Sequence, residues 1–188
     1  VVRFDGTNDF IGTTTATFID DESGTLFMVY RFANNIGGFN IFTISEPAQA
    51  YPNGDEYAIV YRGDSDQEYQ VVRTNAGTSS PNSFTAIDIT TDTNGHFFCL
   101  TSSSTTYTLL VDNIVRTLTP SGAGEWLADA LSANTVNLAV MERTTPAGYM
   151  NGDIAEVIYY NRFLNPIERT SVSRYLARKY NIVITGGF

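Results

Sequence analysis

The stretch GDIAEVIYYNRFLNPIERTSVSRYLARKY, residues 152–180, decides the fold of this 188-residue chain, because a strand pattern runs directly into a helix pattern. Residues 153–160 predict a β-strand, in which successive side chains point to opposite faces. Both faces are largely apolar, so we expect the strand to be covered on both sides. The two expected sets are Ile154, Ile158 and Tyr160 on one face, and Ala155, Val157 and Tyr159 on the other.

Asn165, Pro166 and Glu168 predict the start of a helix. Asn is a favoured N-cap residue, Pro suits the first helical position, and Glu at the third position can answer the cap. We expect this to be the only long helix of the chain. A single helical turn is expected over 126–131. Spacings of three and four residues predict one packing face, formed by Val172, Tyr175, Leu176 and Lys179.

These residues also carry a resemblance to a known family. Residues 152–164, followed by Pro-x-Glu and a helix that ends in Tyr-Leu-x-x-Lys-Tyr, resemble the closing segment of laminin G-type domains in the concanavalin A-like lectin/glucanase superfamily. The opening FDGTNDFI, residues 4–11, resembles the first strand and turn of the same family. The resemblance covers nearly the whole chain and implies a two-sheet jelly roll. That fold hosts lectins, glycosidases, adhesion modules and virion parts, so it implies no single function.

The rest of the chain consists of short strand-like runs separated by turn residues. The most apolar run, 25–32, is expected in the middle of a sheet. Asp112 and Asn113 tolerate positive φ and predict a tight hairpin. We therefore predict an all-β fold, an antiparallel two-sheet β-sandwich of the concanavalin A-like jelly-roll type with one short C-terminal helix.

Composition limits the partners. A length of 188 residues suits one domain, so we expect 1–188 to be a single laminin G-like domain, and a piece of a longer polypeptide because strand character begins at Val2. The net charge of −9 disfavours a nucleic-acid partner. No run approaches the roughly 20 apolar residues of a membrane-spanning helix, so we expect no membrane insertion. The single cysteine, Cys99, excludes an internal disulfide and is expected to be a buried, inert thiol.

Catalysis is disfavoured by the pattern of acids. Glucanases of this fold carry Glu-x-Asp-x-Glu on one strand, which aims three carboxylates into the cleft. The nearest match is Asp153 and Glu156, whose spacing of three places them on opposite faces of a regular strand. Glu156 is expected to anchor a neighbouring loop through hydrogen bonds. The lone His96 is expected to be a satisfied structural residue, since no acid and nucleophile are placed beside it.

Calcium is the metal that the sequence leaves open, because it prefers loop carboxylates and carbonyls. Solvated acidic turns with no metal remain the alternative for the same residues. Zinc is disfavoured, since it needs several Cys or His ligands and the chain has one of each. The candidate calcium ligands lie on two acidic turns and are Asp20, Asp21, Glu22, Asp64 and Asp66.

Sugar binding calls for exposed aromatic rings next to hydrogen-bonding groups. Loop aromatics beside Asn or Asp meet that description, although each could instead plug an end of the sandwich. The candidate ligand-binding residues are Tyr51, Asn53, Asp55, Trp126, Tyr149 and Asn151.

The sequence therefore predicts a non-catalytic carbohydrate-binding or adhesion module of an extracellular, cell-surface or virion protein. The expected partner is a glycan or a protein of the same assembly, and the oligomeric state stays open. The alternative is a structural protein-interaction domain, such as a phage decoration, fibre or tail domain. A glycosidase or polysaccharide lyase is the third class.

Overall fold

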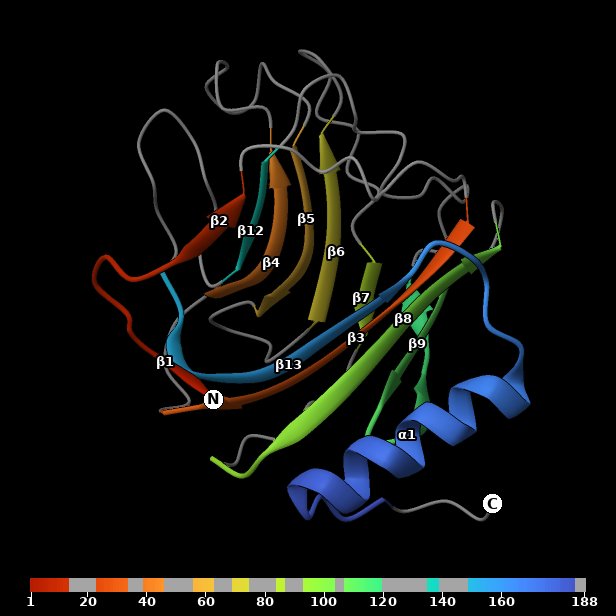
Figure 1. Cartoon of the computed structure of the whole chain (residues 1–188). Helices are drawn as coiled ribbons and strands as arrows, with labels where there is room; N and C mark the ends of the chain where they lie inside the picture. The colour runs from red at the N-terminus through yellow and green to blue at the C-terminus, as the bar shows by residue number, and fades with distance from the viewer. Residues whose placement is uncertain are drawn as a thin grey trace.

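The computed structural model describes residues 1–13, 23–33, 39–45, 56–62, 69–74, 84–86, 93–103, 107–119, 135–138 and 149–184. These residues form two antiparallel sheets and one helix, α1 (Pro166–Tyr180), which confirms the predicted β-sandwich (Figure 1). The six-stranded sheet has the spatial order β1 (Val2–Asp5), β13 (Asn151–Tyr160), β3 (Ser23–Phe32), β8 (His96–Ser103), β9 (Tyr107–Val111) and β10 (Ile114–Arg116). The seven-stranded sheet has the order β11 (Leu118–Thr119), β7 (Phe84–Ala86), β6 (Tyr69–Thr74), β5 (Glu56–Arg62), β4 (Phe39–Ser45), β12 (Thr135–Leu138) and β2 (Ile11–Thr13).

Strand β3 lies inside the six-stranded sheet, as its apolar sequence predicts. It pairs with β13 on one side and with β8 on the other, and nearly all of its residues are buried. Because opposite residues of antiparallel strands point to the same face, the register divides the sheet into two apolar faces. Figure 1 shows α1 on one side of this sheet and the seven-stranded sheet on the other. The six-stranded sheet is therefore covered on both faces.

The face toward the seven-stranded sheet carries an aromatic group centred on Tyr30. The Tyr30 ring lies 5.2 Å from the ring of Phe32 and 6.1 Å from that of Phe98, measured between centroids. All three are almost fully buried. The helix face carries a different core, which contains Phe27, Phe97, Leu164, Leu176 and Ala177 among other residues. Each burial removes apolar surface from water, which is the main force that holds the layers together.

A β-bulge in β13 corrects the predicted alternation of that strand. Ile154 pairs with Tyr30 and Glu156 pairs with Val29, so Ala155 is an extra residue without a partner position on β3. Ile154 consequently shares the face of Tyr30, whereas Ile158 and Tyr160 pack into the core under the helix. The prediction that Ile154 and Ile158 share a face was wrong, because the extra residue reverses the alternation.

The start of α1 forms as predicted. The Asn165 side chain accepts hydrogen bonds from the backbone N–H groups of Ile167 and Glu168, at 2.9 and 3.1 Å. Glu168 answers by accepting from the Asn165 backbone N–H at 2.9 Å, which completes a capping box. Pro166 occupies the first turn. Local sequence therefore specifies this helix end.

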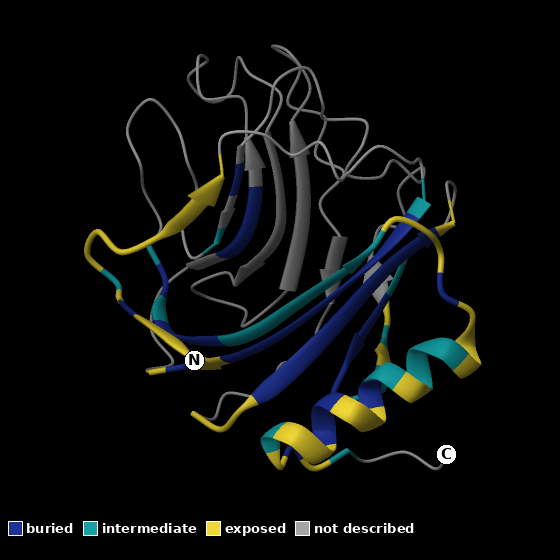
Figure 2. Ribbon diagram, viewed as in Figure 1, coloured by how far each residue is buried: buried dark blue, intermediate teal, exposed yellow. Residues whose placement is uncertain are grey.

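The packing face of α1 differs in part from the prediction. Leu176 and Ala177 are buried and Val172 is half-buried, while Tyr175 is 46 % exposed and Lys179 is also exposed (Figure 2). Tyr175 and Lys179 lie at the margin of the packed face, where both bond to Glu156. Helical spacing alone does not distinguish the centre of a buried stripe from its edge.

The described part of the chain contains no helix with the length and apolar character required to cross a membrane.

Candidate binding site

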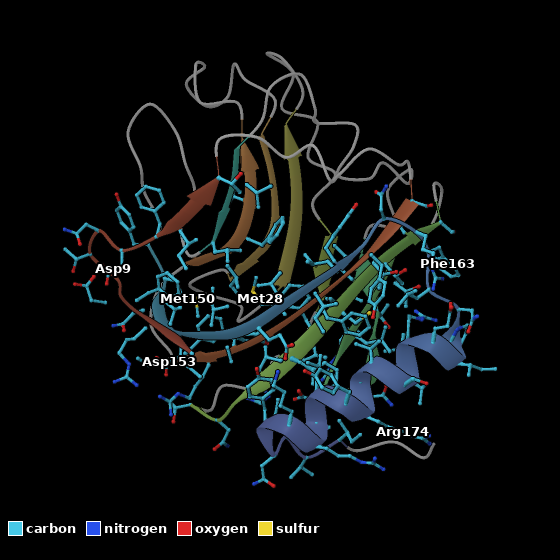
Figure 3. All side chains as sticks on the ribbon, viewed as in Figure 1. Asp9, Met28, Met150, Asp153, Phe163 and Arg174 are labelled. Atoms are coloured by element: carbon cyan, nitrogen blue, oxygen red, sulfur yellow. The ribbon has the colours of Figure 1, made fainter. Side chains whose placement is uncertain are left out.

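Two arginines share one carboxylate where β1, β13 and β3 lie side by side. Arg3 on β1 donates from Nε to Asp153 Oδ1 at 2.8 Å and from Nη2 to Oδ2 at 3.2 Å. Arg31 on β3 donates from Nε to Asp153 Oδ2 at 3.0 Å, and its Nη2 bonds to the same oxygen. We call these three residues the Arg–Asp–Arg cluster. Figure 3 shows Asp153 near the N-terminal end of the chain, well away from Arg174 on the helix.

Strand register brings the cluster together. Arg3 and Arg31 are the partners of Asp153 on its two neighbouring strands, so all three side chains rise from the same face of the sheet. The side chain of Asp153 is only 8 % exposed, whereas those of Arg3 and Arg31 are 75 % and 47 % exposed. The carboxylate is therefore covered by guanidinium groups that themselves face solvent.

The electrostatics of the cluster favour its ionised form. The hydrogen bond from Arg3 lowers the pKa of Asp153, and the hydrogen bond and charge of Arg31 act in the same direction, together outweighing the opposing effect of burial. The hydrogen bond to Asp153 also raises the pKa of Arg3. Within the cluster, two positive charges thus face one negative charge at neutral pH, and Asp5 adds a second carboxylate to the lining of the adjoining pocket.

A pocket of about 550 Å³ opens beside the cluster. This volume lies within the range of small-molecule sites. It is lined by the two arginines, by residues that carry amide, hydroxyl and carboxylate groups, and by two phenylalanines that are almost fully buried. The lining residues are Arg3, Phe4, Asp5, Arg31, Phe32, Ala33, Thr93, Asn151, Gly152 and Asp153.

The turn after β1 packs against Asn151, one of the residues that line the pocket. Asp5 Oδ1 accepts a hydrogen bond from the Thr7 backbone N–H at 2.7 Å, which closes a local turn. Gly6 has φ of +78°, and a Cβ atom placed there would lie 2.9 Å from Asn151 Cβ. Only glycine adopts this conformation readily while it packs directly on the start of β13. The opening motif therefore seats the turn against Asn151.

Of the six predicted ligand-binding residues, Asn151 lines this pocket, and the half-buried Tyr149 precedes it by two residues. Tyr51, Asn53, Asp55 and Trp126 lie outside the described residues. Sequence reasoning missed the two arginines, because 28 residues separate them and neither belongs to a motif. Their joint position depends on strand order and could not be found from local pattern.

Calcium remains untested as a ligand of this chain. Asp20, Asp21, Glu22, Asp64 and Asp66 all lie outside the described residues. Among the residues that are described, no group of three or more His, Cys, Asp or Glu side chains is arranged to hold a metal ion.

The two acids of β13 lie on the same face, which corrects the expectation that they face opposite sides. The bulge pairs Asp153 with Arg31 and Glu156 with Val29, two positions of equal parity on β3. Glu156 accepts hydrogen bonds from Tyr175 Oη at 3.2 Å and from Lys179 Nζ at 3.1 Å. Its predicted role as an anchor is confirmed, although it holds the helix and not a loop.

Neither acid suits the role of general acid. Burial raises the pKa of Glu156, but hydrogen bonds from Lys179, Tyr180 and Tyr175 outweigh it, so its pKa lies below its ordinary value. The pKa of Asp153 is lowered as well. Glycoside hydrolysis by paired carboxyl groups requires one whose pKa is raised. Neither carboxyl group of this pair has the raised pKa that the general-acid role requires.

His96 is buried and bonded to an acid, which the sequence reading did not foresee. Its Nδ1 lies 2.6 Å from Asp112 Oδ2, and Asp112 Oδ1 accepts from the Phe97 backbone N–H at 3.0 Å. Asp112 and Asn113 have φ of +50° and +68°, which confirms the predicted hairpin turn. The pair fixes this turn against β8, so the expectation that His96 is a satisfied structural residue is confirmed. Cys99 is fully buried, and burial raises the pKa of its thiol to about 12, as expected for an inert thiol.

No protein-family model matches the chain, and no curated protein matches it. Solved structures do match. The CBM40 of the Ruminococcus gnavus IT-sialidase, bound to α2,3-sialyllactose, matches with a TM-score of 0.67 and 14 % identity, over 88 % of this chain and 96 % of that chain. The NanB sialidase of Streptococcus pneumoniae matches with a TM-score of 0.70 and 15 % identity, over 89 % of this chain but only 27 % of that chain.

A heptameric SAP-like pentraxin from Limulus polyphemus matches with a TM-score of 0.59 and 11 % identity, over 91 % of this chain and 80 % of that chain. At these identities the likeness establishes the fold. The chain has the β-sandwich fold of the concanavalin A-like lectin/glucanase superfamily, as the sequence resemblance implied. The matches do not single out the laminin G type within it.

Proposed function

We propose that this chain is a non-catalytic carbohydrate-binding module. The observation that carries the proposal is the structural likeness to a CBM40 solved with α2,3-sialyllactose, which extends over 88 % of this chain and 96 % of that one. A match of that extent covers most of both chains and is not confined to a part of either one. The same module was also solved with α2,6-sialyllactose. Sialylated glycans are therefore the first ligands to test.

The pocket beside the Arg–Asp–Arg cluster gives the proposal a location. Its volume of about 550 Å³ accommodates one or two sugar rings, and its amide, hydroxyl and guanidinium groups match the hydroxyl groups of a sugar. The lowered pKa values of Asp153 and Glu156 support binding over hydrolysis at this end of the sheet.

The proposal extends to the setting of the module. We propose that residues 1–188 form one domain of a longer polypeptide, displayed outside the cell, on a cell surface or on a virion. Calcium held by the acidic turns at 20–22 and 64–66 is part of the same proposal, because carboxylates on loops are the ligands that calcium prefers.

A glycan-array screen of the purified protein, run once with calcium and once with chelator, tests the function. Selective binding to a small set of glycans is the expected result. Binding that chelator abolishes would assign calcium a role, and binding that survives chelator would remove calcium from the proposal. A blank array from folded protein would overturn the glycan proposal and direct the search to a protein of the same assembly.

A further inference from the structure

Resting on the proposed glycan-binding function, we infer that this pocket selects acidic sugars. The carboxylate of the sugar binds across Arg3 and Arg31, and Asp153 is the positioning residue that holds both guanidinium groups in place. The inference names the ligand class of the pocket and the residues that discriminate it from neutral glycans.

The first argument is the balance of charge. The chain has 11 Lys and Arg against 20 Asp and Glu, so positive groups are scarce. One arginine is enough to neutralise one buried carboxylate, yet Asp153 receives two. The cluster by itself therefore carries one positive charge in excess, on arginines that line the pocket, while the Asp5 carboxylate, two residues farther along β1, lines the same pocket. An anionic group bound directly at the arginines would compensate the excess charge of the cluster.

The second argument is the supply of hydrogen-bond donors. A guanidinium group has five N–H donors in a planar fork that suits carboxylates. Arg3 and Arg31 each use Nε and Nη2 on Asp153, and within the described part of the chain Nη1 of both arginines bonds to no acceptor. Charge-assisted bonds from arginine to a carboxylate are among the stronger contacts a binding site can make.

The third argument is preorganisation. The carboxylate of Asp153 is 8 % exposed and fixed at the start of β13, so the guanidinium groups are held from below while their outer edges face solvent. Long arginine side chains otherwise lose rotamer entropy when they bind a ligand. The cluster meets part of that cost before the ligand arrives.

A comparison within the chain separates this arrangement from an ordinary ion pair. Arg162 is 55 % exposed and bonds to Glu168 at 2.8 and 3.1 Å, one arginine to one carboxylate, where the pair supports the start of α1. Arg31 is 47 % exposed, a similar fraction, but shares its carboxylate with a second arginine beside a pocket. Arg162 is thus a matched control for the loss of an exposed, paired arginine.

The pocket also contains the groups that would bind the rest of the sugar. Asn151 and Thr93 present amide and hydroxyl groups, and Asp5 presents a carboxylate whose Oδ1 already accepts from Thr7. A second anionic group near Asp5 would be repelled. The arrangement favours a sugar with one negative group at the arginines and hydroxyl groups elsewhere.

The experiment is isothermal titration of the wild-type protein with α2,3-sialyllactose, with lactose and with 3′-sulfolactose, repeated for Arg3→Gln, Arg31→Gln and Arg162→Gln. We expect sialyllactose to bind more tightly than the other two sugars. Loss of either cluster arginine should weaken sialyllactose binding by roughly tenfold to a hundredfold, the usual effect of losing a charge-assisted hydrogen bond. Lactose affinity should stay unchanged, and Arg162→Gln should behave as wild type. Melting temperatures confirm that each variant is folded. If the Gln variant of a cluster arginine is not folded, the Lys variant at the same position, such as Arg31→Lys, replaces it.

The test of Asp153 must distinguish a role in positioning the two arginines from a purely structural role. Asp153→Asn adds one unit of positive charge to the pocket, so simple attraction predicts tighter sialyllactose binding. A positioning role predicts weaker binding, by several-fold, together with partial recovery in Asp153→Glu. Tighter binding to Asp153→Asn would overturn the positioning role.

The remaining outcomes separate this inference from the proposed function. Equal binding of lactose and sialyllactose by the wild type would overturn acid selection and leave a glycan-binding module. Equal binding of 3′-sulfolactose would overturn the assignment to a carboxylate. Sialyllactose binding that survives in both arginine variants would remove the pocket from recognition. Failure of every glycan, here and on the array, would overturn the function itself.

Discussion

Asp153 and Glu156 lie three residues apart on the same face of β13, and their surroundings differ sharply. Glu156 is enclosed by helix α1, which supplies Tyr175, Lys179 and Tyr180 around it. Asp153 lies beyond the helix and is held by two arginines whose outer edges face solvent. Both carboxyl groups are ionised and paired, so charge alone does not distinguish them.

The two acids differ in how many hydrogen-bond donors of their partner residues are already used. The groups around Glu156 also bond to one another, since Lys179 Nζ donates to Tyr175 Oη at 2.7 Å. Within the described part of the chain, Nη1 of each arginine beside Asp153 bonds to no acceptor, and both arginines line the pocket. Glu156 is half-buried and bonds one element to another, whereas Asp153 holds two exposed arginines beside a pocket.

The largest expected effect lies at the helix-covered end. Leu176 is fully buried in the core between α1 and the sheet, so Leu176→Ala should lower the free energy of unfolding by about 2–5 kcal/mol. Ile167, on the same helix, is 80 % exposed, and Ile167→Ala should stay within about 0.5 kcal/mol of wild type. Urea unfolding measures both. Equal effects of the two variants would refute the assignment of the buried face.

A smaller effect is expected at the end of the sheet that lies beyond the helix, where Gly152 of β13 packs directly on the backbone of β3. A Cβ atom on Gly152 would lie 2.2 Å from the Arg31 carbonyl oxygen and 3.1 Å from Phe32 Cα, so Gly152→Ala must displace backbone. We expect a loss of about 1–3 kcal/mol, as for other overpacked sites, together with weakened sialyllactose binding.

Gly95 supplies the control for this glycine. A Cβ atom there would meet nothing closer than Ile182 Cγ1 at 4.0 Å, and Gly95→Ala should therefore leave both stability and binding near wild type. Thermal unfolding and titration of the two variants check the pair. A Gly152→Ala protein that binds normally would show that the backbone beside Arg31 does not shape the pocket.

The smallest expected effect is a dependence of stability on pH. The folded protein lowers the pKa of Asp153 and of Glu156 below their ordinary values near 4. The unfolded chain therefore binds protons first, and the stabilisation from both acids is present above about pH 4 and lost as the pH falls through the lower folded-state pKa values. Because the partner cations are exposed and screened by solvent, each pair contributes only a small part of the stability.

Urea unfolding at pH 6 and pH 3 measures this loss. Asp153→Asn and Glu156→Gln should each remove part of it, since neither side chain titrates. If both variants lost as much stability between the two pH values as wild type, other carboxyl groups would have to account for the acid sensitivity.

How well each feature could be predicted from the sequence depended on whether nearby or distant residues form it. The helix start was predictable because Asn165, Pro166 and Glu168 act within one turn, and the hairpin because Asp112 and Asn113 tolerate positive φ. Asn151 was also singled out from local pattern, and it lines the pocket. Arg3 and Arg31 were not, because nothing in their neighbourhoods marks them and only strand order brings them to Asp153.

The sequence by itself determined the sandwich, the central place of β3 and the capped helix, because alternation, apolar runs and capping are local properties of the chain. Tertiary structure alone decided which faces those residues share. The bulge at Ala155 reversed the alternation of β13, which placed Asp153 and Glu156 on one side and set Ile154 opposite Ile158. A bulge is a property of the pairing of two strands, and the pocket at the end of β1, β13 and β3 is a property of three, so neither can be read from one segment.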